Sequence, residues 1–184
     1  MSDHNAVVAV YGTHQNAQKA VNELKHAGFD MKKLSIIGRD FQNEQHVVGY
    51  YNSGDRMKYW GKLGALWGGL GGIQVGTAFF LIPGVGPVLI AGPLAAYIVR
   101  AVEGAVVVGG LSAIGGGLFS IGIPKNSILK YEAALKADKF LVIAHGTRDE
   151  VQHARDILGT TKAADLGVHV SDAEETSSAG GATS

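Results

Sequence analysis

Hydrophobic residues follow two different patterns along this chain of 184 residues. Near both ends, short apolar runs are followed by segments in which apolar positions recur at helical spacing. The middle of the chain, residues 59–123, is one long apolar block in which only Lys62, Arg100 and Glu103 carry charge. The pattern predicts four parts: a first half-domain (1–58), the apolar insert (59–123), a second half-domain (124–170) and a disordered tail (171–184).

The two ends of the chain repeat each other. Residues 6–24 align without gaps with residues 140–158, so that Gly12 and Thr13 match Gly146 and Thr147. Each copy begins with an apolar run typical of a buried strand, turns at Gly-Thr and continues with the periodicity of an amphipathic helix. Thr147 and Glu150 have the spacing of a capping box, which favours a helix start at this turn.

A second strand is predicted after each helix, over Lys33–Gly38 and over Ala164–Val170. Two strand–helix–strand units in a short chain indicate an α+β fold, a ferredoxin-like split βαβ sandwich interrupted by the apolar insert. Right-handed crossovers then place both helices on one face of an antiparallel sheet. Val7–Val10 and Leu141–Ala144 are the expected central strands of this sheet.

Two shorter elements are also expected in the flanking parts. Residues 46–51 have the composition of an extra edge strand, and Gly28 is a plausible stop for the first helix. A short helix is predicted after Pro124, with Asn126 or Ser127 as its N-cap.

The apolar insert is predicted to be a long Gly-rich hydrophobic helical hairpin. Leu63–Ile82 and Gly104–Ile123 are uncharged runs long enough to span a hydrocarbon core of about 30 Å. The piece between them contains Pro83, Pro87 and Pro93, which indicates a bent or re-entrant segment. A single long bent return helix starting at Pro87 is an alternative.

Small residues recur at every fourth position of the insert. On a helix this spacing forms a smooth stripe against which a second helix backbone can pack closely. The helix-packing or oligomerisation residues expected from this glycine-zipper pattern are Gly64, Gly68, Gly72 and Gly76, followed by Ala101, Ala105, Gly109, Ala113 and Gly117.

The charged residues of the insert have two interpretations. Arg100 and Glu103 lie three positions apart, so on a helix they can form an ion pair, and a buried pair in an apolar setting marks a pathway or a subunit contact. Alternatively, both side chains are solvated at a membrane surface or a helix bend. Lys62, between Trp60 and Trp67, has the character of an interfacial anchor.

Composition narrows the candidate chemistry. The formal net charge is zero, so no attraction of the whole chain to nucleic acid is expected. The chain has no cysteine, which excludes disulfides and thiolate catalysis and suits a reducing cytoplasm, and its start lacks the features of a secretory signal. None of the seven histidines has a metal-binding spacing. We therefore predict no catalytic residue, no metal and no cofactor.

Two further patterns concern the repeated turns. Gly12 and Gly146 stand alone at their strand-to-helix turns, without the additional glycines of a nucleotide-binding loop. His14 and His145 flank these equivalent turns, so the repeat allows them to be neighbours and to form a pH-sensitive pair.

Motifs in the second half of the chain resemble those of a known family. They are a PGxGP and AGPLAA block, then a Gly-rich stretch, then GIP and a YE-containing helix: Pro83, Gly84, Gly86, Pro87, Gly92 and Pro93, then Gly122, Ile123, Pro124, Tyr131 and Glu132. The chain resembles the bacterial general stress proteins of the heat-induced YflT-like group over residues 5–146. This resemblance implies expression linked to stress, and it implies no established reaction.

The leading hypothesis is a non-enzymatic stress-associated bacterial protein with its ferredoxin-like domain on the cytoplasmic side of the inner membrane. The glycine-zipper hairpin would contact membrane lipid and drive assembly into a homo-oligomer. In the first alternative, hairpins of several subunits bury one another in a soluble cytoplasmic ring, cage or filament. In the second, the chain is a small-ligand-binding regulatory module. The sequence identifies no nucleic-acid partner and no small-molecule substrate.

Overall fold

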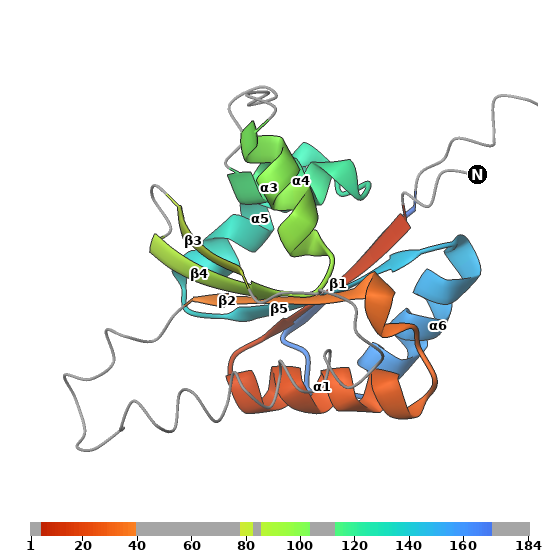
Figure 1. Ribbon diagram of the computed structural model, residues 1–184. Helices are drawn as coiled ribbons and strands as arrows, with labels where there is room; N and C mark the ends of the chain where they lie inside the picture. Colours follow the sequence, from red (N-terminus) through yellow and green to blue (C-terminus); the bar gives the residue numbers. More distant parts are fainter. Residues whose placement is uncertain (1–4, 40–77, 83–85, 104–112, 171–184) are drawn as a thin grey trace, which may run out of the picture.

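The computed structural model describes residues 5–39, 78–82, 86–103 and 113–170. Within these ranges the chain is a mixed α/β domain built on one antiparallel sheet with the strand order β3-β4-β2-β5-β1-β6 (Figure 1). The strands are β1 (Asn5–Tyr11), β2 (Leu34–Arg39), β3 (Ala78–Ile82), β4 (Gly86–Ala91), β5 (Phe140–Gly146) and β6 (Asp165–His169). The helices are α1 (His14–His26), the 3-10 turn η1 (Met31–Lys33), α3 (Leu94–Glu103), α4 (Ala113–Ser120), α5 (Lys125–Lys136) and α6 (Arg148–Gly159).

The repeated ends of the chain form equivalent units at the middle of the sheet. Strand β1 pairs antiparallel with β5, with Asn5 opposite Gly146 and Tyr11 opposite Phe140. Strand β6 pairs with the other side of β1, and β2 pairs with the other side of β5. The two strand–helix–strand units predicted from the repeat are therefore present, and β1 and β5 are neighbouring interior strands, as predicted.

The predicted caps of the two repeated helices are confirmed. The Thr13 hydroxyl accepts a hydrogen bond from the amide of Asn16, and Thr147 forms a complete capping box with Glu150. The prediction for the helix after Pro124 was wrong in its cap. Pro124 itself is the N-cap, because its carbonyl already accepts the amide of Ser127, so the helix begins ahead of both polar candidates.

The predicted helical hairpin is wrong for residues 78–91. Strands β3 and β4 pair antiparallel with each other, and β4 continues the sheet beside β2, with Ile37 opposite Ile90. An unbroken apolar run carries no periodicity that separates a buried strand from a helix. Pro87 cannot donate a backbone hydrogen bond within a helix, and it lies at the second position of β4. Residues 59–77 and 104–112, and the expected strand over 46–51, lie outside the described residues.

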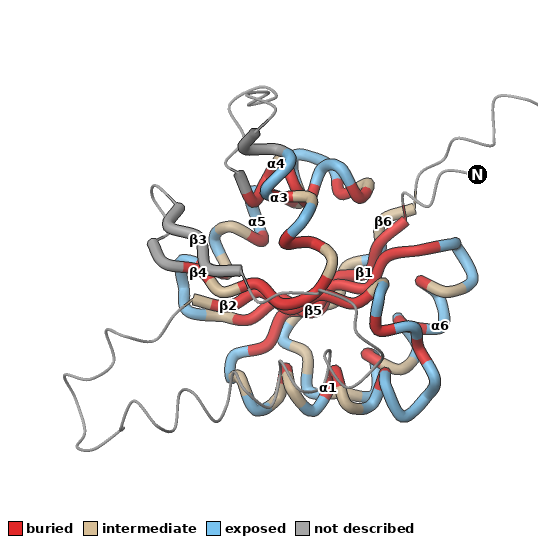
Figure 2. Tube along the Cα trace, viewed as in Figure 1, coloured by how far each residue is buried: buried red, intermediate tan, exposed pale blue. Residues whose placement is uncertain are grey.

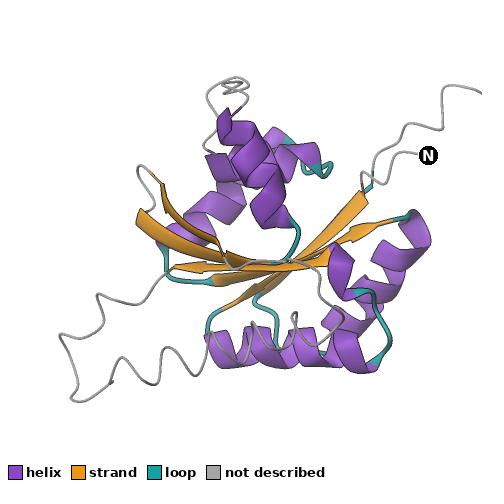
Figure 3. Cartoon of the chain, viewed as in Figure 1, coloured by secondary structure: helices purple, strands orange, loops and turns teal. Residues whose placement is uncertain are grey.

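Helices cover the two faces of the sheet unequally (Figure 3). Helices α1 and α6 lie on one face, where they bury one core with the odd-numbered residues of β1, such as Val7 and Ala9. Helices α3, α4 and α5 lie on the other face. Among the described helices, none has both the length and the apolar character needed to cross a membrane.

The second core explains much of the apolar insert. Val88 and Ile90 of β4, Ile98 of α3 and Leu118 of α4 are fully buried in one cluster with Val8 of the first half-domain (Figure 2). Leu141 and Ile143 of β5 complete the same cluster from the second half-domain. Hydrophobic side chains of the insert therefore pack against both flanking parts of the chain.

Candidate functional site

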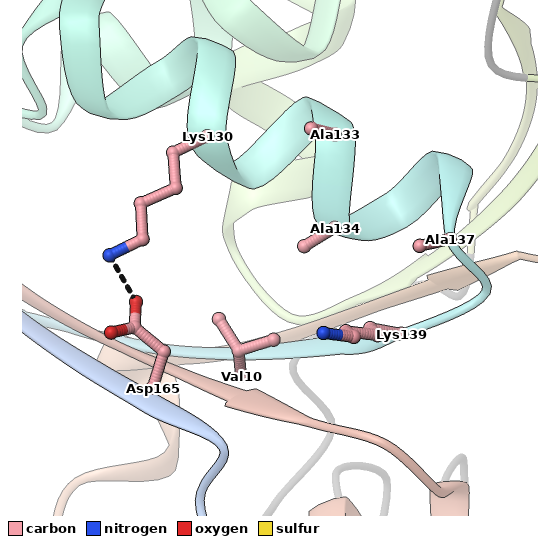
Figure 4. Close-up of a pocket in the computed structure, with 7 residues that line it drawn as sticks. All are labelled: Val10, Lys130, Ala133, Ala134, Ala137, Lys139 and Asp165. Atoms are coloured by element: carbon pink, nitrogen blue, oxygen red, sulfur yellow. Dashed lines mark ion pairs between the residues drawn. The ribbon is translucent and has the colours of Figure 1, made fainter.

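A pocket of about 280 Å³ lies between helix α5 and the sheet. We call it the α5 pocket. It is lined by Val10, Lys130, Ala133, Ala134, Ala137, Lys139 and Asp165 (Figure 4). Ala133 and Ala134 lie in α5 and Ala137 is its C-cap. The helix buries Ile128, Tyr131 and Leu135 on its inner side. Because the alanine side chains are short, the helix leaves space above Val10 of β1.

Three charged side chains lie around the α5 pocket. The Lys130 ammonium pairs with the carboxylate of Asp165 over 2.5 Å and closes one end (Figure 4). Lys139, just before β5, extends along the sheet toward Val10. Within the described ranges, no carboxylate forms an ion pair with Lys139, so the pocket has an excess of positive charge.

A polar pair continues from the pocket along β6. The hydroxyl of Tyr131 and Nε2 of His169 are hydrogen-bonded over 2.7 Å. Burial, together with the nearby carboxylate of Asp165, raises the pKa of Tyr131 to about 12. Burial, together with the Lys130 ammonium, lowers the pKa of His169. Both side chains are therefore neutral near pH 7. Gly167 of β6 leaves room for this pair, because a Cβ at this position would clash with the Tyr131 hydroxyl.

His145 occupies a corresponding place on β5. Ala6 of β1 is paired with His145 of β5 on one side and with His169 of β6 on the other. Because Ala6 belongs to the core under α3, α4 and α5, both histidines lie on the face that these helices cover. The ring of His145 packs edge-on against Tyr97 of α3 at a centroid distance of 6.0 Å.

The expectation that His14 and His145 are neighbours was wrong. Antiparallel pairing sends equivalent turns to opposite ends of the strands, and the His14 ring packs against Phe140.

The junction between β4 and α3 lies close to the backbone of β2. Gly92 has φ +104°, and a Cβ there would lie 2.8 Å from Cα of Ser35 and would clash with the carbonyl oxygen of Leu34. The hydroxyl of Ser35, fully buried in β2, accepts a hydrogen bond from the amide of Leu94 over 3.1 Å. This contact explains why the AGPLAA sequence needs its glycine, because a side chain would force the turn away from β2.

Lys33 and Glu150 link the two repeated units. Their side chains form an ion pair of 2.7 Å between the end of η1 and the first turn of α6. The Lys33 ammonium and the amide of Thr147 hold the pKa of Glu150 below its usual range. A carboxylate in the first turn also suits the positive end of the helix dipole. The contact therefore supports the helix start and fixes α6 against the first unit.

The predicted stripes of small residues are described only in part. Gly64, Gly68, Gly72, Gly76, Ala105 and Gly109 lie outside the described residues, whereas Ala101 lies in α3 and Ala113 and Gly117 lie in α4. A Cβ at Gly117 would come within 2.5 Å of Cγ1 of Ile98, so α3 and α4 approach closely at this glycine. Arg100 is exposed on α3. Its pairing with Glu103 stays a prediction.

Comparison with known families gives a match over the first part of the chain. Residues 6–77 match the family described as heat-induced stress protein YflT domain. This segment is similar to a YflT domain. Strands β1 and β2 and helix α1 lie inside this domain, whereas the PGVGP and AGPLAA motifs follow it. The YflT domain confirms the resemblance to the heat-induced stress proteins and fits a stress-associated role. No curated protein and no solved structure was found to match.

The sequence did not point to the α5 pocket. Its residues come from positions 10, 130–139 and 165, and only the packing of α5 across β1 and β6 brings them together. Of the polar residues around the pocket, the sequence had singled out Tyr131 alone, through the family motif. Within the described ranges, no cluster of three or more histidine or acidic side chains has a metal-binding arrangement.

Proposed function

We propose that this chain is a non-enzymatic stress-associated protein that self-assembles through the layer of helices α3, α4 and α5. The observation that supports assembly is the set of large apolar side chains exposed on this layer. Val99 of α3 is 38% exposed, Phe119 of α4 is 44% exposed and Leu129 of α5 is 63% exposed. Apolar side chains gathered on a surface favour contact with another protein surface or with lipid.

The non-enzymatic part of the proposal is supported by how the buried polar groups are used. Ser35 caps α3, and the side-chain amide of Asn5 donates a hydrogen bond to the backbone carbonyl of Gly146. The hydroxyl of Tyr11 is hydrogen-bonded to Thr161 over 2.6 Å. Each of these contacts joins elements that are distant in the sequence, so the polar groups stabilise the fold.

We also propose that the repeated units form a ferredoxin-like split βαβ domain. The order β6-β1-β5-β2 and the position of α1 and α6 on one face support this assignment. In this arrangement β3, β4, α3 and α4 extend the sheet and cover its second face. The ferredoxin-like domain is then the scaffold that presents the helical layer for assembly.

Membrane contact remains part of the proposal for residues 59–77, which carry the first glycine stripe. These residues would hold the assembly at the cytoplasmic side of the inner membrane. The alternative is a cytoplasmic assembly without lipid, which the burial of Val88, Ile98 and Leu118 inside the domain favours for the rest of the insert.

Assembly is tested by measuring the mass of the particles that the full-length protein forms in solution, by sedimentation velocity. We expect an oligomer for the wild type and a shift toward the monomer for the double variant Phe119→Ser, Leu129→Ser, because it removes apolar contact area. Val168→Ser, on β6 away from the helical layer, is the matched control and should keep the oligomer. A wild type that is monomeric, or a double variant of unchanged mass, would contradict the proposal.

Extraction of untagged protein from cells distinguishes an assembly in contact with the membrane from an assembly without lipid. Release only by detergent would support lipid contact, whereas recovery of the oligomer without carbonate or detergent would support assembly without lipid.

A further inference from the structure

The α5 pocket has the properties of a binding site for a small organic anion. Its volume of about 280 Å³ is close to the lower end of the range for ligand pockets. Its walls are methyl groups of Val10 and of three alanines, with charged groups only at the ends. Apolar walls with a few convergent polar groups are the usual composition of such sites.

The charge in the pocket selects the sign of the ligand. Lys130 is already paired with Asp165, and this pair is neutral as a whole. Lys139 adds a second ammonium group that extends toward Val10 and forms no ion pair with a described carboxylate. An incoming carboxylate can therefore form a charge-assisted hydrogen bond with Lys139 without displacing Asp165.

The shape of the pocket selects the rest of the ligand. Helix α5 and its C-cap have alanine at positions 133, 134 and 137 above the sheet, where longer side chains would fill the space. Tyr131 and Leu135, on the same helix, are fully buried in the core and hold α5 at this height. A hydrocarbon body of a few carbons can lie against these methyl groups and leave its charged end at Lys139.

We propose that the α5 pocket binds a short-chain aliphatic carboxylate, with the carboxylate on Lys139 and the hydrocarbon chain between α5 and Val10. The contacts at Lys139 and Val10 lie at the sheet, whereas the alanine wall shares helix α5 with Leu129 of the layer proposed for assembly. Ligand binding is measured by calorimetry and self-assembly by sedimentation, so the failure of one is distinguished from the failure of the other.

The test is calorimetric titration of the full-length protein with hexanoate, with 1-hexanol and inorganic phosphate as comparison ligands. We expect saturable binding of hexanoate, and binding at least about tenfold weaker for both comparison ligands. Hexanol lacks the charged group that binds Lys139, and phosphate lacks the hydrocarbon chain that packs against the alanines. Absence of saturable hexanoate binding, or equal binding of hexanol or phosphate, would overturn the proposal.

Two variants and two controls locate the site. Lys139→Met should weaken hexanoate binding by about tenfold, and Ala133→Leu should abolish it by filling the pocket. Lys136→Met and Ala96→Leu make the same changes at exposed positions outside the pocket and should bind as the wild type does. Thermal unfolding confirms that each variant is folded. Wild-type binding by either pocket variant, or equal loss in its control, would contradict the assignment.

Discussion

The hydroxyl oxygen of Ser35 in β2 accepts a hydrogen bond from the amide of Leu94, the first residue of α3, over 3.1 Å. The first amides of a helix have no partner within the helix, and here a strand from another part of the chain supplies one. Ser35 lies inside the YflT domain, whereas Leu94 lies beyond it. The contact therefore fixes the helical layer to the face of the sheet.

Ser35→Ala is expected to lower the free energy of unfolding by about 1–3 kcal/mol, because it leaves the buried amide of Leu94 without an acceptor. Urea denaturation of the purified protein measures this change. Ser127→Ala is the matched control, since the Ser127 side chain does not cap α5, and its effect should stay within about 0.5 kcal/mol. Equal stability of the two variants would show that the Ser35 contact contributes nothing.

Gly92→Ala is expected to destabilise the protein by roughly 1–3 kcal/mol, because φ is positive and the new Cβ meets the backbone of β2. Gly159→Ala is the opposite case. It lies at the end of α6 with no atom within 4 Å of an added Cβ, so we expect a gain of about 0.4–1 kcal/mol. Thermal unfolding should therefore move in opposite directions for the two substitutions, and a shift in the same direction would refute this reading of the β4–α3 turn.

Gly117 and Ile98 should behave as a coupled pair. Gly117→Ala places a methyl group against Ile98, and Ile98→Ala alone leaves a cavity that costs about 2–5 kcal/mol. In the double variant the added methyl occupies part of that cavity, so the loss should be smaller than the sum of the single losses by at least about 0.5 kcal/mol. A double-mutant cycle by urea denaturation measures this coupling, and strict additivity would place the two helices farther apart than described.

Stability should fall in mild acid because of His169. Its pKa in the folded protein lies below the ordinary 6.5, so the unfolded chain binds more protons as the pH decreases. The stabilisation is therefore present above pH 6.5 and is lost as the pH falls through the lowered pKa. His169→Gln, which removes this titration, should flatten the loss between about pH 7 and pH 5, whereas His153→Gln at an exposed site of α6 should not. Identical pH profiles for both variants would exclude His169 as the cause.

The repeated strand–helix–strand units were predictable because local signals in their sequence mark the turns and the starts of the helices. Gly12, Thr13 and the capping box of Thr147 with Glu150 mark the turns, and the helices that follow have a clear polar face. The insert lacks such contrast. From position 63 to position 82 nearly every residue is apolar or glycine, so the start of β3 at Ala78 has no local mark.

The candidate site could not be predicted for a related reason. The pairing of β4 with β2 and the packing of α5 above Val10 join residues far apart in the sequence. Lys139 and Asp165 are ordinary surface residue types, and only the tertiary arrangement gives their charges a common pocket. The hydropathy of the insert is evident from the sequence, but hydropathy alone does not distinguish contact with a membrane from burial in a second protein core.

The most direct test of this account is hydrogen exchange of the full-length protein in detergent-free buffer, followed by mass spectrometry. The central claim is that β4 and α3 of the insert, through Val88, Ile90, Leu94 and Ile98, form part of the core on one face of the sheet. We predict that backbone amides of β4 and α3 are protected to a degree similar to those of β1 and β5, because they belong to one buried cluster. Rapid exchange over residues 88–98 in buffer, with protection appearing only after lipid vesicles are added, would contradict it.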